Sequence, residues 1–254
     1  MVLAIIGLLA AMLLPAMSRA KAKGQTIGCM NNIRQLHIGW ALYAEENNDN
    51  LVPNADTGDL VGVTGGWISG NMASNLEEQD VRLMTDPQAS LLARYVPQAA
   101  SYRCPADRTK QVRSFSLNCR MNAWRDPKIG KPRWIEGRGT NHVVYQRLHD
   151  ISVPANIFAF VDERADTIND GSFATDFSHT GHPEGIGVPR PYFMIDFPAN
   201  RHNRAGNLSF ADGHVESHTW IEPTSHPAQA SLRTHTTATD RDVRWLLDHA
   251  TEPK

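Results

Sequence analysis

This chain of 254 residues has little net charge, few cysteines and no nucleotide-binding motif. Its 25 Lys and Arg nearly balance its 27 Asp and Glu. This balance excludes binding to nucleic acid through a net positive charge of the whole chain. Three cysteines are too few for a disulfide-stapled scaffold, and a chain of this length can bury a core without one. The sequence has neither a P-loop nor a GxSxG nucleophile elbow. It therefore carries no standard signature of an ATPase or a serine hydrolase.

The first seventeen residues contain no charge at all. Residues 2–17 form an apolar run that is interrupted only by Gly7 and Pro15. As a helix this run spans about 24 Å, short of the roughly 30 Å hydrocarbon core of a bilayer. A secretory signal peptide would need a basic residue before the apolar run, and no basic residue precedes it. A buried core helix is the alternative, but that helix would show a polar stripe. We expect a membrane helix that lacks its beginning.

A basic flank and an amphipathic segment follow the apolar run. Arg19, Lys21 and Lys23, taken alone, would place the downstream chain in the cytoplasm. From residue 26 to residue 47 apolar side chains recur at helical spacing, and the segment ends in an Asn-rich turn. Together the two segments predict one rod of about 45 residues and about 65 Å, kinked at Pro15. Such a rod is anchored at one end and packed against a domain at the other.

The remainder of the chain predicts an α+β domain. Residues 112–118 and 157–161 read as strands, and the lack of alternation in the second indicates burial on both faces. Residues 90–95 and 239–249 read as short helices. Asp212-Gly213 predicts a hairpin over residues 207–220, since this dipeptide favours a tight turn. A two-residue turn would set Ser209 opposite Glu216 and would place His214, Glu216 and His218 on one wet face.

Several segments resemble type IV pilin-like proteins, and in particular the large pseudopilin-like group of Planctomycetes, Verrucomicrobia and Lentisphaerae. The start AIIGLLAAMLLPAMSRAKAK, followed by CMNNIRQLHIGWALYAEENNDNLVP, is similar to the N-terminal helix of these proteins. The marker of the group, a His, nine residues and Asp-Gly, is matched by His202, Asp212 and Gly213. The stretches YRCPAD, VRSFSLN and FVDERADTINDGSF are also similar to family segments.

One departure from the family concerns the beginning of the chain. The prepilin peptidase site, a basic leader that ends in a small residue before Phe and a nearby Glu, is absent. Aligning Gly7 and Pro15 with the family helix leaves about seven mature residues unmatched before Met1. We expect a start codon assigned too late, so that the upstream DNA would encode an in-frame leader.

The resemblance implies a non-enzymatic subunit of a type II secretion or type IV pilus-like filament. Residues 1–50 would form the pilin-like helix, with residues 1–17 as its truncated transmembrane segment, packed on an antiparallel sheet of a globular domain over residues 51–254. The domain would lie in the periplasm or on the cell surface, anchored by a single pass in the inner membrane. The partners implied are other pseudopilin subunits, the inner-membrane platform of the secretion system and a secreted substrate, with no nucleic acid. Gly7 and Pro15 would tune helix packing, whereas the helix would dock through Ile33, Leu36 and Trp40.

Two metal sites can be argued from the residues. Hard oxygen ligands suit calcium, which some pseudopilins use to order a loop, although the spacing matches no EF-hand. The candidate calcium ligands are Asp162, Glu163, Asp166, Asn169 and Asp170. His214, Glu216 and His218 could alternatively hold zinc on the hairpin face, which would give a metal-dependent hydrolase. The alternative for that face is a solvated surface.

The histidine of the motif and the cysteines have structural interpretations. His202 could act as a base oriented by Asp212, but the simpler prediction is that His202 hydrogen-bonds to the Asp212-Gly213 turn or to a neighbouring loop. Cys104 and Cys119 are candidates for a disulfide if the domain is extracytoplasmic, and Cys29 is expected to be a small buried residue.

A further functional alternative is an envelope polysaccharide-binding module anchored by the helix. Aromatic rings exposed in one groove would bind sugars. The candidate rings are Trp67, Trp134 and Trp220.

Overall fold

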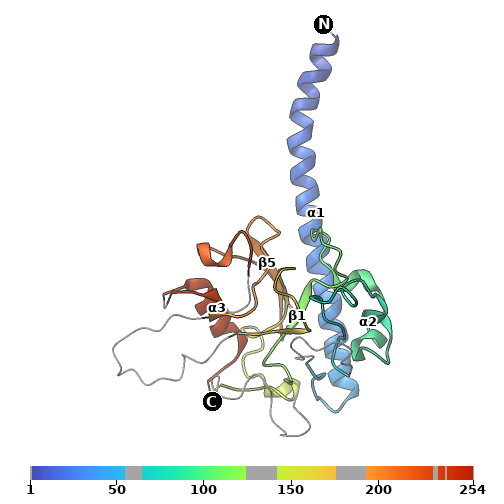
Figure 1. The fold of residues 1–254 in the computed structure, drawn as a ribbon, viewed down its shortest axis with the longest axis vertical. Coiled ribbons are helices and arrows are strands. Elements are labelled where there is room, and N and C mark those ends of the chain that lie inside the picture. The colour runs from blue at the N-terminus through green and yellow to red at the C-terminus, as the bar shows by residue number, and fades with distance from the viewer. Residues whose placement is uncertain are drawn as a thin grey trace.

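The computed structural model describes residues 2–54, 65–123, 142–175, 193–230, 234–237 and 239–253. The fold is α+β, with a long N-terminal helix that extends from a domain built around a five-stranded sheet (Figure 1). The elements are α1 (Val2–Glu46), α2 (Arg82–Thr85), η1 (Leu91–Arg94), η2 (Ala99–Tyr102), β1 (Phe115–Asn118), η3 (Leu148–Asp150), β2 (Phe158–Asp162), β3 (Ser172–Phe173), β4 (Phe193–Met194), β5 (Ala205–Phe210), β6 (Val215–Thr219), η4 (Pro223–Ser225), β7 (Thr234–His235) and α3 (Arg241–Ala250).

Helix α1 is continuous through Pro15 and changes character along its length. Its N-terminal part stands clear of the domain (Figure 1), whereas its C-terminal part is embedded in it. Ile33, Leu36 and Trp40, the residues expected to dock the helix, are fully buried in one core cluster with Phe115 and Phe160 of the sheet. In the described part of the chain, no helix combines the length and the apolar character needed to cross a membrane.

The sheet is mixed, which corrects the prediction of a wholly antiparallel one. The strand order is β3-β1-β2-β5-β6, with three antiparallel pairs and one parallel pair between β1 and β3. After β2 the chain crosses to the far edge of β1 and runs opposite to β2. It therefore becomes parallel to β1. Strands β4 and β7 form a separate two-stranded sheet.

Strand β2 is central and is buried along its whole length, as its apolar sequence predicted. Phe160 faces the core shared with α1, whereas Phe158 and Val161 belong to a second core cluster under α3. The register of β2 with β5 shifts between Phe158 and Phe160, so the usual alternation is interrupted. The sheet thus separates two cores, with α1 on one face and α3 on the other.

The hairpin between β5 and β6 forms as predicted, but the predicted register was wrong by one residue. Ser209 lies opposite Val215, not Glu216. The amide of Phe210 donates to the carbonyl of His214, so three residues close the loop. Only Gly213 among them has a left-handed φ, of 95°. This is the geometry of a three-residue hairpin loop that ends in a glycine bulge. An Asp-Gly pair is compatible with this loop and also with a two-residue turn.

Candidate functional site

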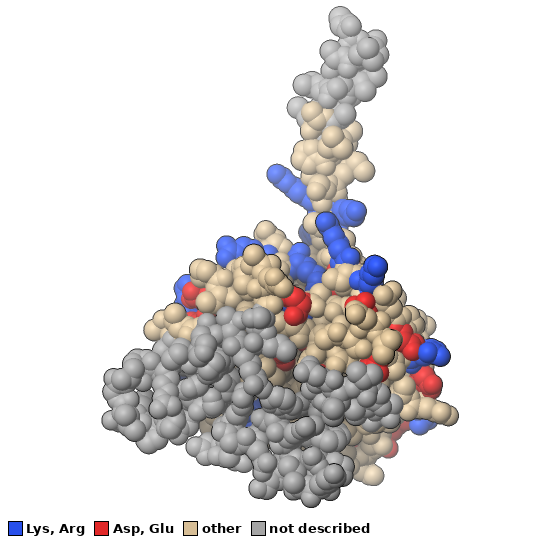
Figure 2. Space-filling model, in the orientation of Figure 1, with Lys and Arg blue, Asp and Glu red and all other residues tan. Residues whose placement is uncertain are grey.

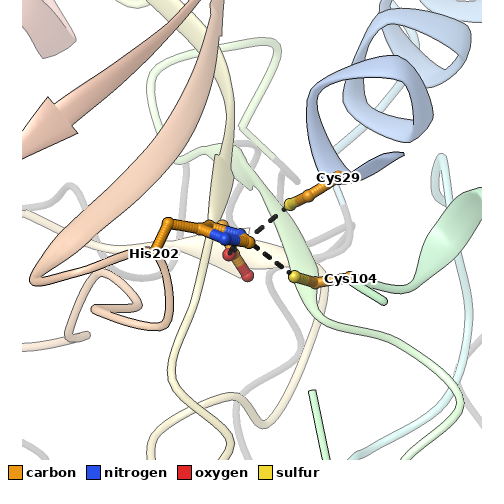
Figure 3. Close-up of side chains that lie close together, drawn as sticks. Cys29, Cys104 and His202 are labelled. Atoms are coloured by element: carbon orange, nitrogen blue, oxygen red, sulfur yellow. Dashed lines mark hydrogen bonds and ion pairs between the residues drawn. The ribbon is translucent and has the colours of Figure 1, made fainter. Parts of the chain in front are cut away.

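Four polar side chains from distant parts of the sequence meet in the interior, where α1 packs on the sheet. Cys29 comes from α1, Cys104 follows η2, Asp162 ends β2, and His202 precedes β5. One potential ligand atom from each lies within 4.8 Å of all the others, and all four residues are buried. Across the residues described, no other group of three or more His, Cys, Asp or Glu side chains converges in this way. We call these four residues the Cys-His-Asp cluster (Figure 3).

The distances within the cluster are those of side chains in direct contact. Cys104 Sγ lies 3.3 Å from His202 Nε2. Asp162 Oδ2 lies 3.7 Å from Cys29 Sγ and 3.6 Å from His202 Nε2. The side chain of His202 is only 2% exposed, and that of Asp162 is completely buried. The cluster is therefore a dry polar centre inside the domain.

A tight turn and a helix hydroxyl fix the imidazole of His202. Asn203 and Arg204, the two residues after it, both have left-handed φ values, of 55° and 67°. Asn tolerates this conformation, whereas Arg rarely adopts it. The amides and carbonyls of His202 and Ala205 bond reciprocally across the turn. On the other side of the ring, Nδ1 of His202 lies 3.1 Å from Oγ1 of Thr26 on α1.

The loop that carries Cys104 is held by α1 on both sides of Cys29. The Asn32 amide donates to the carbonyls of Ala100 and Arg103, at 2.9 and 2.7 Å. Gln25 donates to the carbonyl of Pro105 at 3.1 Å. Gln25 and Asn32 precede and follow Cys29 by four and three residues, so all three share one helix face. The same face thus positions both cysteines.

Arg201 and Asp107 link Asp162 to the protein surface. The Arg201 guanidinium pairs with Oδ1 of Asp162 and, at 3.0 Å, with Asp107. The backbone carbonyl of Asp162 accepts from the amide of Ala199 at 2.7 Å. Arg201 and Asp107 also line an open hollow of about 580 Å³, whose lining includes none of the four cluster residues. Arg201 therefore stands between this hollow and the cluster.

Burial and the hydrogen bonds between the cluster residues shift the pKa values of Cys29, Cys104 and His202. Burial raises the pKa of Cys29 well above that of a free thiol, and its hydrogen bond to Cys104 raises it further. The same bond from Cys29, with help from His202, lowers the pKa of Cys104 to about 7. Burial alone would lower the pKa of His202, but the hydrogen bonds with Asp162 and Cys104 outweigh it and raise the pKa to about 9. These shifts favour a thiolate on Cys104 beside a protonated imidazole of His202.

The His-X9-Asp-Gly motif spans a whole strand, so His202 bonds to a neighbouring loop, the second of its two predicted partners, and not to the Asp212-Gly213 turn. Strand β5 separates the two ends of the motif by about 20 Å. His202 bonds instead to Thr26 and Cys104. The turn is met by another histidine of α1. A Cβ added to Gly213 would lie 3.4 Å from Nε2 of His37. Both ends of the motif thus contact one helix.

The five residues predicted to bind calcium do not converge on one point. Asp162 belongs to the Cys-His-Asp cluster, and Glu163 accepts a hydrogen bond from Ser116 in the interior. Asp166 pairs with Arg164 at 2.7 Å. Successive residues of an extended strand point to opposite faces, which separates the first two carboxylates. Among described residues, the acidic run gathers no three ligands around a common centre; the predicted set was Asp162, Glu163, Asp166, Asn169 and Asp170.

The disulfide predicted between Cys104 and Cys119 is not formed. None of the three cysteines belongs to a disulfide, and all three are buried. Cys104 faces His202, whereas Cys119 lies 3.8 Å from the hydroxyl of Thr175. The two thiols belong to different environments, because Cys104 is drawn to α1 and Cys119 follows the end of β1.

The hairpin histidines pack against aromatic rings. His218 stacks on Trp245 of α3 with ring centroids 3.8 Å apart, and His214 stacks on Phe210 at 4.3 Å. His214 also pairs with Asp212 at 2.6 Å. With Glu216 they form no metal-binding group in the part of the chain that the structure describes.

Two of the three rings proposed for a polysaccharide groove belong to described residues, and neither is exposed. Trp67 and Trp220 are both fully buried. Their indole nitrogens donate to the carbonyls of Gly171 and Ala199, each at 2.9 Å. Trp134 lies outside the described residues. The groove thus loses two of the three rings on which that alternative depended.

Sequence reasoning named all four cluster residues, but it assigned them separate roles and gave His202 only a hydrogen bond to a turn or loop, or the role of a base. It treated Cys29 as a small buried residue, Cys104 as half of a disulfide and Asp162 as a calcium ligand. No spacing motif joins Cys29, Cys104, Asp162 and His202, because they come from four segments that lie far apart in the sequence. Comparison with protein-family models, curated proteins and solved structures found no match to this chain.

Proposed function

We propose that the chain is a non-enzymatic, pilin-like subunit of a secretion or pilus-like filament. The helix α1 would pack against the same helix of neighbouring subunits, and the domain would project outward. In this proposal the apolar start also holds the subunit in the inner membrane before assembly, with the domain in the periplasm or on the cell surface. Its partners are other filament subunits, the inner-membrane platform and a secreted substrate. A separate ATPase supplies the energy.

The observation that carries the proposal is a set of exposed apolar side chains in the described part of α1 that precedes the domain. Leu13, Leu14 and Met17 are 58%, 68% and 66% exposed on a part of α1 that stands clear of the domain (Figure 1). Gln25 is the first described side chain of the helix to bond to the domain. A helix with so little support is marginal in water, since most helical stability comes from packing of an apolar face. Packing against like helices would supply that face.

The basic residues support the same arrangement. Arg19, Lys21 and Lys23 are exposed where α1 leaves the domain, between the apolar end and the globular part (Figure 2). Basic side chains at this position suit the headgroup region beside a membrane-inserted segment. They would keep the domain at the membrane surface while the apolar end is buried.

Assembly of the full-length chain after detergent removal tests the proposal. We expect wild-type protein to form ordered filaments or short helical oligomers, visible by electron microscopy and by light scattering. The double substitution Leu13→Glu and Leu14→Glu should leave the protein monomeric, because it places charge on the proposed helix–helix surface. Leu76→Glu is the matched control, since Leu76 is an apolar residue of the domain that is 85% exposed.

Two results would contradict the proposal. One is a wild-type chain that stays monomeric without detergent. The other is a double variant that assembles as well as wild type, because the exposed apolar part of α1 would then have no role in subunit contacts.

A further inference from the structure

We propose that the Cys-His-Asp cluster is a structural zinc site, in which Cys29, Cys104, Asp162 and His202 are the four ligands. The metal would clamp helix α1 to the loop after η2, the end of β2 and the turn before β5. Two sulfurs, one imidazole nitrogen and one carboxylate oxygen form a ligand set that favours Zn²⁺ over the hard cations Ca²⁺ and Mg²⁺.

The distances match the edges of a zinc tetrahedron. Zinc bond lengths to sulfur, nitrogen and oxygen place neighbouring tetrahedral ligands about 3.3–3.8 Å apart. The three measured edges are 3.3 Å for Cys104 Sγ to His202 Nε2, 3.7 Å for Cys29 Sγ to Asp162 Oδ2, and 3.6 Å for His202 Nε2 to Asp162 Oδ2. Three of the six edges therefore stand at coordination spacing, and the other three are within 4.8 Å, so a metal needs only small side-chain movements to be bound by all four ligands. Figure 3 shows Cys29, Cys104 and His202 pointing toward one centre.

The hydrogen bonds around His202 prepare it to bind a metal. The Thr26 hydroxyl donates to the carbonyl of Ala22 at 3.1 Å, so its oxygen is left to accept from Nδ1–H of His202. This places the proton on Nδ1 and turns the lone pair of Nε2 toward Cys104 and Asp162. A metal-bound histidine characteristically donates its other ring N–H to an oxygen in this way.

The second carboxylate oxygen and the charge balance fit the same assignment. Arg201 pairs with Oδ1 of Asp162, which leaves Oδ2 facing the cluster. Two thiolates, one carboxylate and a neutral imidazole carry a charge of −3. Zn²⁺ together with the Arg201 guanidinium offsets it. All four positions are filled by protein and all four residues are buried, which is typical of a structural site rather than a catalytic one with an open position.

Zinc content of the reduced full-length chain tests the inference. We expect wild type, supplied with Zn²⁺ and desalted, to retain one zinc per chain by mass spectrometry. Cys29→Ser and Cys104→Ser should each lose it. Cys119→Ser is the matched control, because Cys119 is also a buried cysteine outside any disulfide but does not belong to the cluster. A strong chelator should lower the melting temperature of wild type and of the control.

A second measurement covers the case in which the cluster variants fail to fold. Wild-type protein loaded with Co²⁺ should show the visible absorption of tetrahedral cobalt together with a thiolate charge-transfer band. Zinc binding needs no assembly, so the result is independent of the filament proposal.

Three results would overturn the inference. The first is reduced wild type that binds neither zinc nor cobalt in this form. The second is Cys119→Ser losing the metal as fully as the cluster variants do. The third is peptide mapping of the native chain that finds a Cys29–Cys104 disulfide.

Discussion

Cys29 on α1 contacts Asp162 at the end of β2 across 3.7 Å in the protein interior, although 133 residues separate them. Cys29 is also the first described residue of α1 that is fully buried. N-terminal to Cys29, the described side chains of α1 are exposed or half-buried; from Cys29 onward, one face of the helix is part of the core. The first prediction follows from this boundary.

Truncation of α1 should have two sharply different effects. Removing residues 1–18 should leave a folded, monomeric domain, because the described side chains of this part are exposed. Removing residues 1–34 should abolish cooperative unfolding, because it deletes Cys29 and the fully buried Ile33. Loss of a core side chain such as Ile33 alone costs about 2–5 kcal/mol. Near-UV circular dichroism and thermal melting measure both. A folded 35–254 fragment would refute the boundary.

His37 should make the domain less stable in acid. Burial lowers the pKa of His37 from 6.5 to about 4, so the folded chain keeps it neutral where the unfolded chain binds a proton. The contribution of neutral His37 to the free energy of unfolding is complete above pH 6.5. It is lost as the pH falls toward 4, and the loss is at most about 3 kcal/mol. His37→Gln should flatten this part of the stability curve. Urea unfolding of both proteins between pH 7 and pH 4 gives the comparison; identical slopes would exclude the effect.

Gly206 should tolerate no side chain, for a reason of space. A Cβ at this position of β5 would lie 2.6 Å from the carbonyl oxygen of Ala199, which accepts the indole hydrogen bond of Trp220. Gly206→Ala should cost roughly 2–3 kcal/mol, since backbone must shift. Gly24→Ala is the control: nothing lies within 4 Å there, and the helix should gain up to about 1 kcal/mol. Chemical denaturation measures both. Equal effects would disprove the steric argument.

Asn32 should control access to Cys104. Its amide holds the carbonyls of Ala100 and Arg103, and Asn32→Ala should destabilise the domain by about 1–3 kcal/mol, because these acceptors lose their donor. The freed loop should also let an alkylating reagent reach Cys104 faster. Mass spectrometry of labelled peptides follows that rate. Arg34→Ala, which changes an exposed residue of the same helix, should leave the labelling rate of Cys104 unaltered. No gain in Cys104 labelling in Asn32→Ala would show that the loop is held by other contacts.

The local elements could be predicted from sequence because local patterns encode them. The apolar period of residues 26–47 predicts which face of α1 is buried, and Ile33, Leu36 and Trp40 lie on it. The unbroken apolar run of residues 157–161 predicts a strand buried on both sides, as β2 is. The hairpin turn followed from Asp212-Gly213, but its register did not, because this dipeptide closes loops of two or three residues.

The sequence by itself determined that one end of this protein is apolar, that a helix carries it into an α+β domain, and which helix face is buried. Those features arise from the order of neighbouring residues. Only the tertiary structure decided that β3 runs parallel to β1 and that His202 and Gly213 lie at opposite ends of one strand. It also decided that Cys29, Cys104, Asp162 and His202 meet. Side chains so far apart along the chain come together only when a helix packs on a sheet, and no local pattern records which residues that packing will join.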